Sequence, residues 1–145
     1  MILSQTAIYA LQAVMHLAEA GPGEPHRVGD IAEALGVPRN YLAKILNGLA
    51  RSGVLTSTRG PGGGFLLAQD PSGLCLADVI QPFGDVAHES SCLLGRARCS
   101  DIAPCAAHAR WKVVSTAVKG YLLETTIQDM TASCGAVPKP VGPTP

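Results

Sequence analysis

The sequence predicts a mainly α-helical protein with one small β-hairpin, and three observations carry this prediction. Two β-prone runs flank a glycine-rich string, which is typical of a hairpin. The chain has 145 residues, 47% of them apolar, so it is long enough for a cored domain and too apolar to be wholly disordered. Apolar residues also recur at helical spacing in four segments, at about 3–18, 28–35, 39–51 and 101–124.

Overall charge does not indicate a nucleic-acid partner, because 11 Lys and Arg residues balance 11 Asp and Glu residues. The distribution of charge is more informative. No acidic residue lies between Ala34 and Gln69, where the basic residues are Arg39, Lys44, Arg51 and Arg59. A local basic face is typical of phosphate attraction, although an ordinary solvated face has the same composition.

No segment of the sequence predicts a membrane span. The longest unbroken apolar run has five residues, 7–11, whereas a span needs about 20. The N-terminus lacks a basic region and a signal-like cleavage site. We therefore expect a cytoplasmic protein without a membrane partner.

Three helices open the chain. The first, residues 3–18, has Ser4 as its expected cap and stops at Gly21. The second, 28–35, ends at Gly36, and a Gly-Val-Pro turn leads into the third, 39–51. Two short helices joined by a turn that contains glycine are typical of a helix-turn-helix, whose second helix reads DNA.

The hairpin follows the third helix directly. Runs at 54–58 and 65–67 flank the string Arg-Gly-Pro-Gly-Gly-Gly at 59–64, which is where a winged helix carries its wing. A plain flexible turn is an alternative. A phosphate-binding loop is another, but the string lacks the Gly-Lys-Ser/Thr ending and the following helix that such loops have.

The chain after the hairpin divides into four predicted parts. Pro71 and Ser72 open a short helix that ends the DNA-binding domain, 1–83, and carries Cys75 toward the core. A cysteine-rich loop, 84–101, lacks periodicity. A long helix from about Asp101 to Glu124 and a terminal turn make up 102–132, and proline-rich residues predict a disordered tail over 133–145. The short helix has an apolar face of Leu76, Val79, Ile80 and Phe83.

The long helix predicts a homodimer. Too little chain remains to cover its apolar stripe, so we expect it to pack on a second copy, with packing on the protein's own first helix as the alternative. Thr126, with Asp129 three residues later, predicts a cap for the terminal turn. The stripe consists of Ala106, Ala109, Val113, Ala117, Val118, Tyr121 and Leu122.

The cysteines suggest ligands or redox thiols, because a reducing compartment disfavours structural disulfides. Cys92, Cys99, Cys105 and His108 form the pattern Cys-x6-Cys-x5-Cys-x2-His. The last two are expected on one side of a helix start, where the dipole favours a thiolate. Zinc sites usually have shorter Cys–Cys gaps, whereas iron–sulfur clusters accept wider ones. Zinc, inert cysteines and a nucleophilic Cys–His pair stay open, and Cys134 is expected to be a bystander.

Four motifs together resemble one family. They are Tyr9-Ala10-Leu11, Tyr41-Leu42, the string 59–65 and Cys105-x2-His108-x2-Trp111. They resemble the IscR-type branch of the Rrf2 family of bacterial transcription regulators, over residues 1 to about 130. The resemblance implies a homodimeric winged-helix DNA-binding protein, not an enzyme, whose promoter affinity depends on a bound cluster that senses redox state, iron or nitric oxide.

The resemblance also implies the cluster ligands. The positions that match the family's ligand motif are Cys92, Cys99, Cys105 and His108, which would hold a [2Fe-2S] cluster. The first gap has six intervening residues, where the familiar pattern has five. Relatives that sense nitric oxide can hold a [4Fe-4S] cluster through an acidic residue of the first helix. The aligned residue here is Ile8, which cannot ligate, so a [2Fe-2S] cluster is favoured and [4Fe-4S] is the alternative.

The expected partner is double-stranded DNA with a roughly palindromic operator. The N-terminal part of the reading helix puts forward Arg39, Asn40, Tyr41 and Lys44, and the wing tip adds Arg59, Gly60 and Pro61. The main alternative is a regulator of the same fold that uses its cysteines as cluster-free redox thiols or for zinc. A small electron-transfer or metal-carrying protein is a third hypothesis, but it leaves the basic stretch and the wing without a use.

Overall fold

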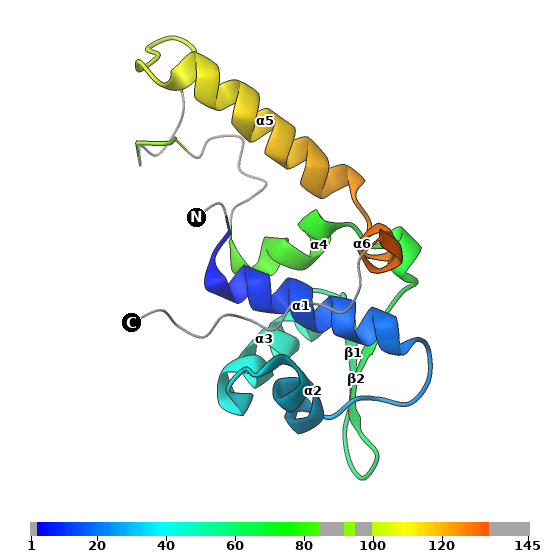
Figure 1. Cartoon of the computed structure of the whole chain (residues 1–145). Helices are drawn as coiled ribbons and strands as arrows, with labels where there is room; N and C mark the ends of the chain where they lie inside the picture. Colours follow the sequence, from blue (N-terminus) through cyan, green and yellow to red (C-terminus); the bar gives the residue numbers. More distant parts are fainter. Residues whose placement is uncertain (1–2, 85–91, 95–99, 134–145) are drawn as a thin grey trace.

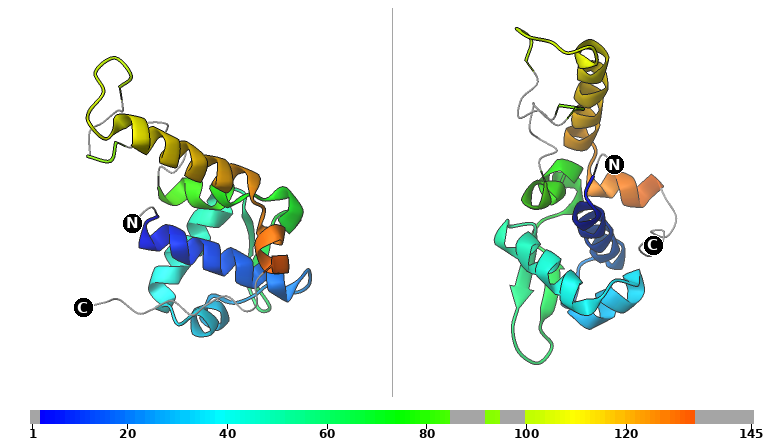
Figure 2. Two further views of the ribbon diagram at one scale, coloured as in Figure 1. Left: turned by 45° about the horizontal axis from the view of Figure 1, so that its top comes forward. Right: turned by 90° about the vertical axis from the view of Figure 1, so that its left-hand side faces the viewer.

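The computed structural model describes residues 3–84, 92–94 and 100–133 (Figures 1 and 2). This part of the chain is mostly helical, with one antiparallel hairpin, as the sequence predicts. The elements are α1 (Gln5–Ala20), α2 (Val28–Leu35), α3 (Arg39–Arg51), β1 (Leu55–Thr58), β2 (Gly64–Leu67), η1 (Pro71–Gly73), α4 (Leu76–Ile80), η2 (Gln81–Phe83), α5 (His108–Glu124) and α6 (Ile127–Ser133).

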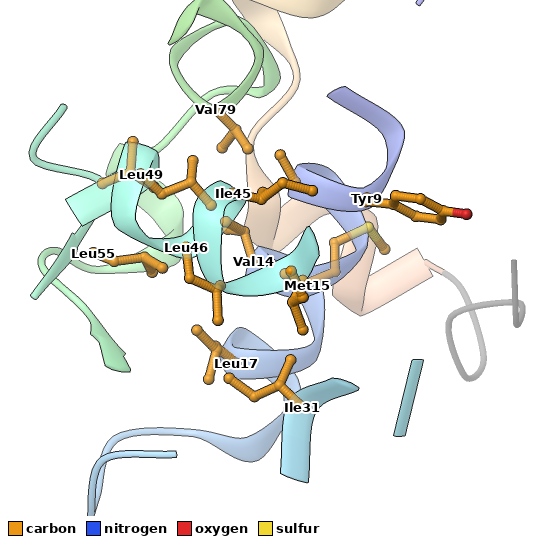
Figure 3. Close-up of a cluster of buried hydrophobic side chains, with 14 of the residues drawn as sticks. Tyr9, Val14, Met15, Leu17, Ile31, Ile45, Leu46, Leu49, Leu55 and Val79 are labelled. Atoms are coloured by element: carbon orange, nitrogen blue, oxygen red, sulfur yellow. The ribbon is translucent and has the colours of Figure 1, made fainter. Parts of the chain in front are cut away.

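Helix α1 is the centre of the packing. It contacts α2, α3, α4, α6 and β2, and Figure 1 shows it running between α4 on one side and α2 and α3 on the other. Val14 of α1 and Leu46 of α3 are fully buried in the core shown in Figure 3. Because each such side chain stabilises the fold by about 1.5–3 kcal/mol relative to exposure, the core fixes how α3 lies on the domain.

The predicted helix limits in the first half of the chain are largely confirmed. The Ser4 hydroxyl accepts the N–H of Ala7 at 3.1 Å and caps α1, which runs to residue 20 rather than 18. Gly36 ends α2 with a φ of 68°, a left-handed conformation that glycine adopts without strain. Helix α3 has the predicted bounds. Gly36 and Pro38 flank the turn between the two helices, as the sequence predicts.

The hairpin is tied to the body along β2. Leu55 pairs with Leu67, and Phe65 exchanges two backbone hydrogen bonds of 3.0 and 2.8 Å with His26, just before α2. At the tip end only glycine fits position 63, because a Cβ there would lie 2.3 Å from the carbonyl oxygen of Thr58. The hairpin is thus held along its second strand by the chain that leads into α2.

The prediction of one continuous helix from Pro71 to Phe83 is wrong, because the segment consists of three short helices, η1, α4 and η2. It is interrupted between η1 and α4, where the Leu74 carbonyl accepts from Ile127 at 2.8 Å and Leu76 N–H donates to Thr125 at 3.0 Å. This pairing with a segment some fifty residues later takes the backbone out of the helix. Cys75 lies at this bridge, half-buried before α4, and not in the core as expected.

Burial is the main cause that raises the pKa of the Cys75 thiol, and the neighbouring Asp78 adds to it. Its Sγ donates to Asp78 Oδ2 at 3.0 Å. The two residues together cap α4, because Asp78 also accepts the N–H of residue 75 at 3.2 Å. This cysteine therefore has a local structural role at the start of a helix.

The long helix begins at His108, whereas the prediction began it near Asp101. Pro104 disfavours helical backbone at the residue before it. The Ser100 hydroxyl accepts the N–H groups of Ile102 and Ala103, both at 3.2 Å, and folds the segment into a turn instead. Cys105 consequently precedes the helix and does not lie on it.

The end of the described chain confirms the predicted cap. Asp129 accepts the N–H of Thr126 at 2.9 Å, and the Thr126 hydroxyl accepts the N–H of Asp129 at 3.1 Å. Ser133, assigned by the prediction to the tail, is the last residue of α6. The rest of the predicted tail, 134–145, lies outside the described residues, as do 85–91 and 95–99 of the predicted loop.

Candidate nucleic-acid interface and metal-ligating site

The exposed face of α3 carries most of the residues predicted to read DNA. Leu42, Ile45, Leu46 and Leu49 are buried, so the opposite face of the helix points to solvent. Arg39, Asn40 and Lys44 are exposed on its first two turns. A shallow hollow of about 670 Å³ lies beside the other end of α3, where Asn47 and Arg51 face Thr56 and Ser57 of β1.

Tyr41 differs from its neighbours because it contacts α1. Its hydroxyl is 2.5 Å from the Thr6 hydroxyl, and its ring meets that of Tyr9 edge-on, with centroids 5.7 Å apart. Its side chain remains 37% exposed. The sequence offered no signal for the partnership with Thr6, because the two residues are 35 positions apart in different helices.

The tip of the hairpin is exposed and basic. Arg59, Gly60 and Pro61 are all exposed, and Gly60 has a φ of 90°. No acidic residue occurs in the sequence between α2 and the end of the hairpin. Helix α3 also contacts β1 directly, so the hairpin and α3 form one packed unit.

The predicted ligands lie partly within the described residues. Cys92 and Cys105 are both half-buried, while Cys99 lies outside the described residues. The His108 side chain is only 11% exposed. Among the residues that the structure describes, no three side chains of ligand type are assembled around one point.

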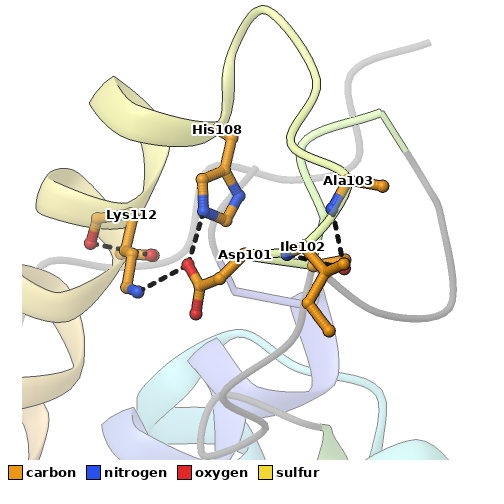
Figure 4. A network of polar contacts seen from close by, with 7 residues as sticks. Asp101, Ile102, Ala103, His108 and Lys112 are labelled. Carbon is orange, nitrogen blue, oxygen red and sulfur yellow. Dashed lines mark hydrogen bonds and ion pairs between the residues drawn. The ribbon is translucent and has the colours of Figure 1, made fainter.

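A carboxylate that the sequence prediction missed holds His108. Asp101 Oδ1 lies 2.8 Å from His108 Nε2 and 2.8 Å from Lys112 Nζ (Figure 4). The turn built on the Ser100 hydroxyl carries Asp101 back to the start of α5, where His108 and Lys112 lie one helical turn apart. Lys112 chiefly, with His108, lowers the pKa of Asp101.

These residues fit the chemistry of a metal or cluster site. Thiolate sulfur and imidazole nitrogen are the ligands of zinc and of iron–sulfur clusters. Histidine ligands in proteins almost always donate their second ring N–H to a carboxylate, a carbonyl or water. The nearly buried His108 has such a carboxylate partner in Asp101.

Helix α5 exposes an apolar face. Only Leu122 is buried, and the contacts of α5 with the body are made mainly to α4. The outward residues Val113 and Tyr121 are 71% and 54% exposed. An apolar groove beside them is lined by Leu3, Ala117, Val118, Tyr121 and Leu122. Packing of α5 on α1, the alternative to a dimer, would leave less of this surface exposed.

The sequence matches the model of the Rrf2 family, described as iron-dependent transcriptional regulators, over residues 3–133. The chain belongs to the Rrf2 family. It is 37% identical, over 132 residues, to an Aquifex aeolicus protein named as an HTH-type transcriptional regulator, which covers 90% of this chain and 91% of that relative. It is 30% identical, over 130 residues, to the HTH-type transcriptional regulator IscR of Escherichia coli, covering 90% of this chain and 80% of that relative.

Solved structures of other regulators have the same fold. CymR of B. subtilis, named as its global cysteine regulator, superimposes with a TM-score of 0.77 at 23% identity, over 92% of this chain and 98% of CymR. IscR of T. potens gives a TM-score of 0.72 at 24% identity, over 90% of this chain and 85% of that chain. The predicted winged-helix fold is therefore confirmed.

This Rrf2 protein is a transcriptional regulator and not an enzyme, since its relatives are named as regulators. Relatives of the HTH type bind DNA. Within residues 3–84, 92–94 and 100–133, no helix is both long and apolar enough to cross a membrane.

Proposed function

We propose that this Rrf2 protein acts in the cytoplasm as a homodimer that binds double-stranded DNA and carries an iron–sulfur cluster whose state controls its affinity for promoters. One observation supports this most strongly. The half-buried Cys105 thiol and the nearly buried His108 imidazole lie together where α5 begins, and α5 exposes an apolar face. A site at this place adjoins the surface through which two copies would associate.

The DNA contacts in this proposal come from α3 and the hairpin tip. Arg39 can pair with guanine and Asn40 with adenine through two hydrogen bonds each, and Lys44 can contact phosphate. Arg59, with Gly60 and Pro61, would enter the minor groove, where negative potential is strongest if the groove is narrow. Tyr41 supports these contacts by bracing α3 against α1.

Dimerisation sets the form of the DNA target. Val113 and Tyr121 of α5 expose more apolar surface than single scattered residues would. Two-fold packing of this face would bring the two α3 helices to half-sites one DNA turn apart, or a multiple of it. The operator is therefore proposed to be roughly palindromic.

Cys92, Cys99, Cys105 and His108 are the proposed ligands of a [2Fe-2S] cluster, with [4Fe-4S] as the alternative. When bound, such a cluster supplies a redox-active centre whose potential depends on its ligands and their hydrogen bonds. The signal would be redox state, iron supply or nitric oxide. In this proposal the protein contributes two half-buried thiols and an imidazole already oriented by Asp101.

A second candidate function is a cluster-free regulator of the same fold that senses redox state through its thiols or binds zinc. The observation in its favour is that Cys92 and Cys105 are half-buried, while the described residues assemble no group of three ligands. Half-buried thiols can be oxidised without any metal.

The visible absorption spectrum of anaerobically purified protein, with its iron, sulfide and zinc contents, separates the two candidates. We expect charge-transfer bands and equal amounts of iron and sulfide in the wild type. The bands should be lost in Cys105→Ser and kept in the matched control Cys75→Ser, since Cys75 caps α4. A colourless wild type, with stoichiometric zinc or with no metal, would favour the second candidate.

A further inference from the structure

The hydrogen bond between Asp101 and His108 determines which nitrogen of the imidazole carries a proton. A carboxylate has no proton to donate, so at 2.8 Å the Nε2 atom of His108 is the donor. A neutral imidazole has one N–H and one nitrogen lone pair, so the lone pair is then on Nδ1. In histidine ligands, the hydrogen bond made by one ring nitrogen sets which nitrogen binds the metal.

The surroundings of Asp101 favour this arrangement. The turn capped by Ser100 places Asp101 seven residues before His108 and against the first turn of α5. Lys112 contacts the same carboxylate oxygen at 2.8 Å and stabilises the negative charge of Asp101. The Asp101 side chain is 70% exposed, whereas that of His108 is 11% exposed, so the hydrogen bond joins a nearly buried imidazole to a solvent-exposed carboxylate.

We propose that Asp101 is a positioning residue for His108, which it fixes as the Nε2–H tautomer so that Nδ1 is the atom presented to the cluster. This inference rests on the cluster ligation proposed above. It adds a residue outside the Cys-x6-Cys-x5-Cys-x2-His pattern and assigns the ligating atom of the histidine.

The opposite role for Asp101 makes the opposite prediction. If Nε2 were the ligating atom, the contact with Asp101 would have to break before ligation, and the carboxylate would compete with the cluster. Removal of Asp101 would then increase cluster retention. As a positioning residue, Asp101 should instead increase retention, by the 10- to 100-fold that such outer partners contribute to metal affinity.

The first measurement uses the cluster-free full chain and does not depend on ligation. Long-range ¹H–¹⁵N correlation spectra of histidine-labelled protein at alkaline pH distinguish the two tautomers, and His108→Gln assigns the signal. We expect the Nε2–H tautomer in the wild type and in Asp101→Asn, which keeps an acceptor oxygen, with mixed tautomers in Asp101→Ala. An Nδ1–H tautomer in the wild type would overturn the proposal.

The second measurement follows cluster loss to an iron chelator under anaerobic conditions, by the decay of the visible bands. Asp101→Ala should lose its cluster about tenfold faster or more, and Asp101→Asn should be intermediate. The matched control Asp30→Ala, at an exposed acid of α2, should equal the wild type. Equal or slower loss in Asp101→Ala overturns the positioning role.

Pulsed electron paramagnetic resonance of the reduced cluster measures the nitrogen coupling of the histidine, which a general loss of stability would not change. The nitrogen coupling of the histidine should change in Asp101→Ala and stay unchanged in Asp30→Ala. An unchanged coupling in Asp101→Ala would count against the proposal. A wild type that binds no cluster at all would overturn both the proposed cluster and this inference, whereas a normal cluster indifferent to Asp101 would overturn the inference alone.

Discussion

Replacing Tyr41 by phenylalanine separates its contact with α1 from any contact with DNA. The substitution removes the hydroxyl bonded to Thr6 and keeps the ring against Tyr9. A hydrogen bond contributes about 0.5–1.5 kcal/mol net. Because Tyr41 is 37% exposed, water can replace the lost partner, so we expect the lower part of this range, about 0.5–1 kcal/mol.

This loss corresponds to a melting temperature lower by about 1–4 °C for a chain of this size. Thermal unfolding followed by circular dichroism measures it. The matched variant Thr6→Val removes the same hydrogen bond from the α1 side and should lower the melting temperature equally. The double variant should be little less stable than either single variant, because both remove one interaction.

DNA affinity is measured on the same variants, with a fragment selected by the wild type from a random-sequence library. If the Tyr41 hydroxyl braces α3, both single variants should bind DNA within about threefold of the wild type, which is under 1 kcal/mol. Additive losses of stability in the double variant would show that the hydrogen bond is not formed in solution. A tenfold loss of affinity in Tyr41→Phe but not in Thr6→Val would show that the hydroxyl contacts DNA.

Three further predictions concern the wing, the dimer and the last helix. Arg59→Ala should weaken DNA binding by about 1–3 kcal/mol at physiological salt. Unchanged affinity in a binding titration would show that the wing does not contact DNA. Val113→Asp should give a monomer in sedimentation at micromolar concentration. The control Gln128→Asp, on the exposed side of α6, should remain a dimer like the wild type. A dimeric Val113→Asp would refute the α5 interface. The N–H and hydroxyl of Thr126 lower the pKa of Asp129, so its stabilising effect is fully present above the unfolded pKa of about 3.9 and is lost as pH falls through the lower folded value. Asp129→Asn should therefore flatten the fall in melting temperature below pH 4, and an identical pH profile in both proteins would show that the cap does not stabilise the fold.

Local chemistry made much of the fold predictable. Helix α3 could be bounded from its apolar period together with the Gly-Val-Pro turn before it. The Thr126–Asp129 cap was predictable because both of its hydrogen bonds span three residues. In each case the signal lies in neighbouring residues of a single segment.

The errors arose where distant or overlooked contacts decided the backbone. The break before α4 depends on backbone pairing with residues 125–127, and no local sequence pattern predicts that pairing. Pro104 and Ser100 were a local signal for the late start of α5, but the prediction gave more weight to the helical spacing of the apolar residues. Asp101 was missed because a lone acid seven residues before a histidine has no recognisable spacing once the segment is not a helix.

One comparison tests most directly whether cluster state controls DNA binding by this protein. The DNA affinity of a single anaerobic preparation is measured before and after its cluster is removed, using the selected fragment. We predict visible charge-transfer bands in the first sample and a change in affinity of tenfold or more, about 1.4 kcal/mol, in the second. A preparation that is colourless, or one whose affinity is the same with and without its cluster, would contradict the claim.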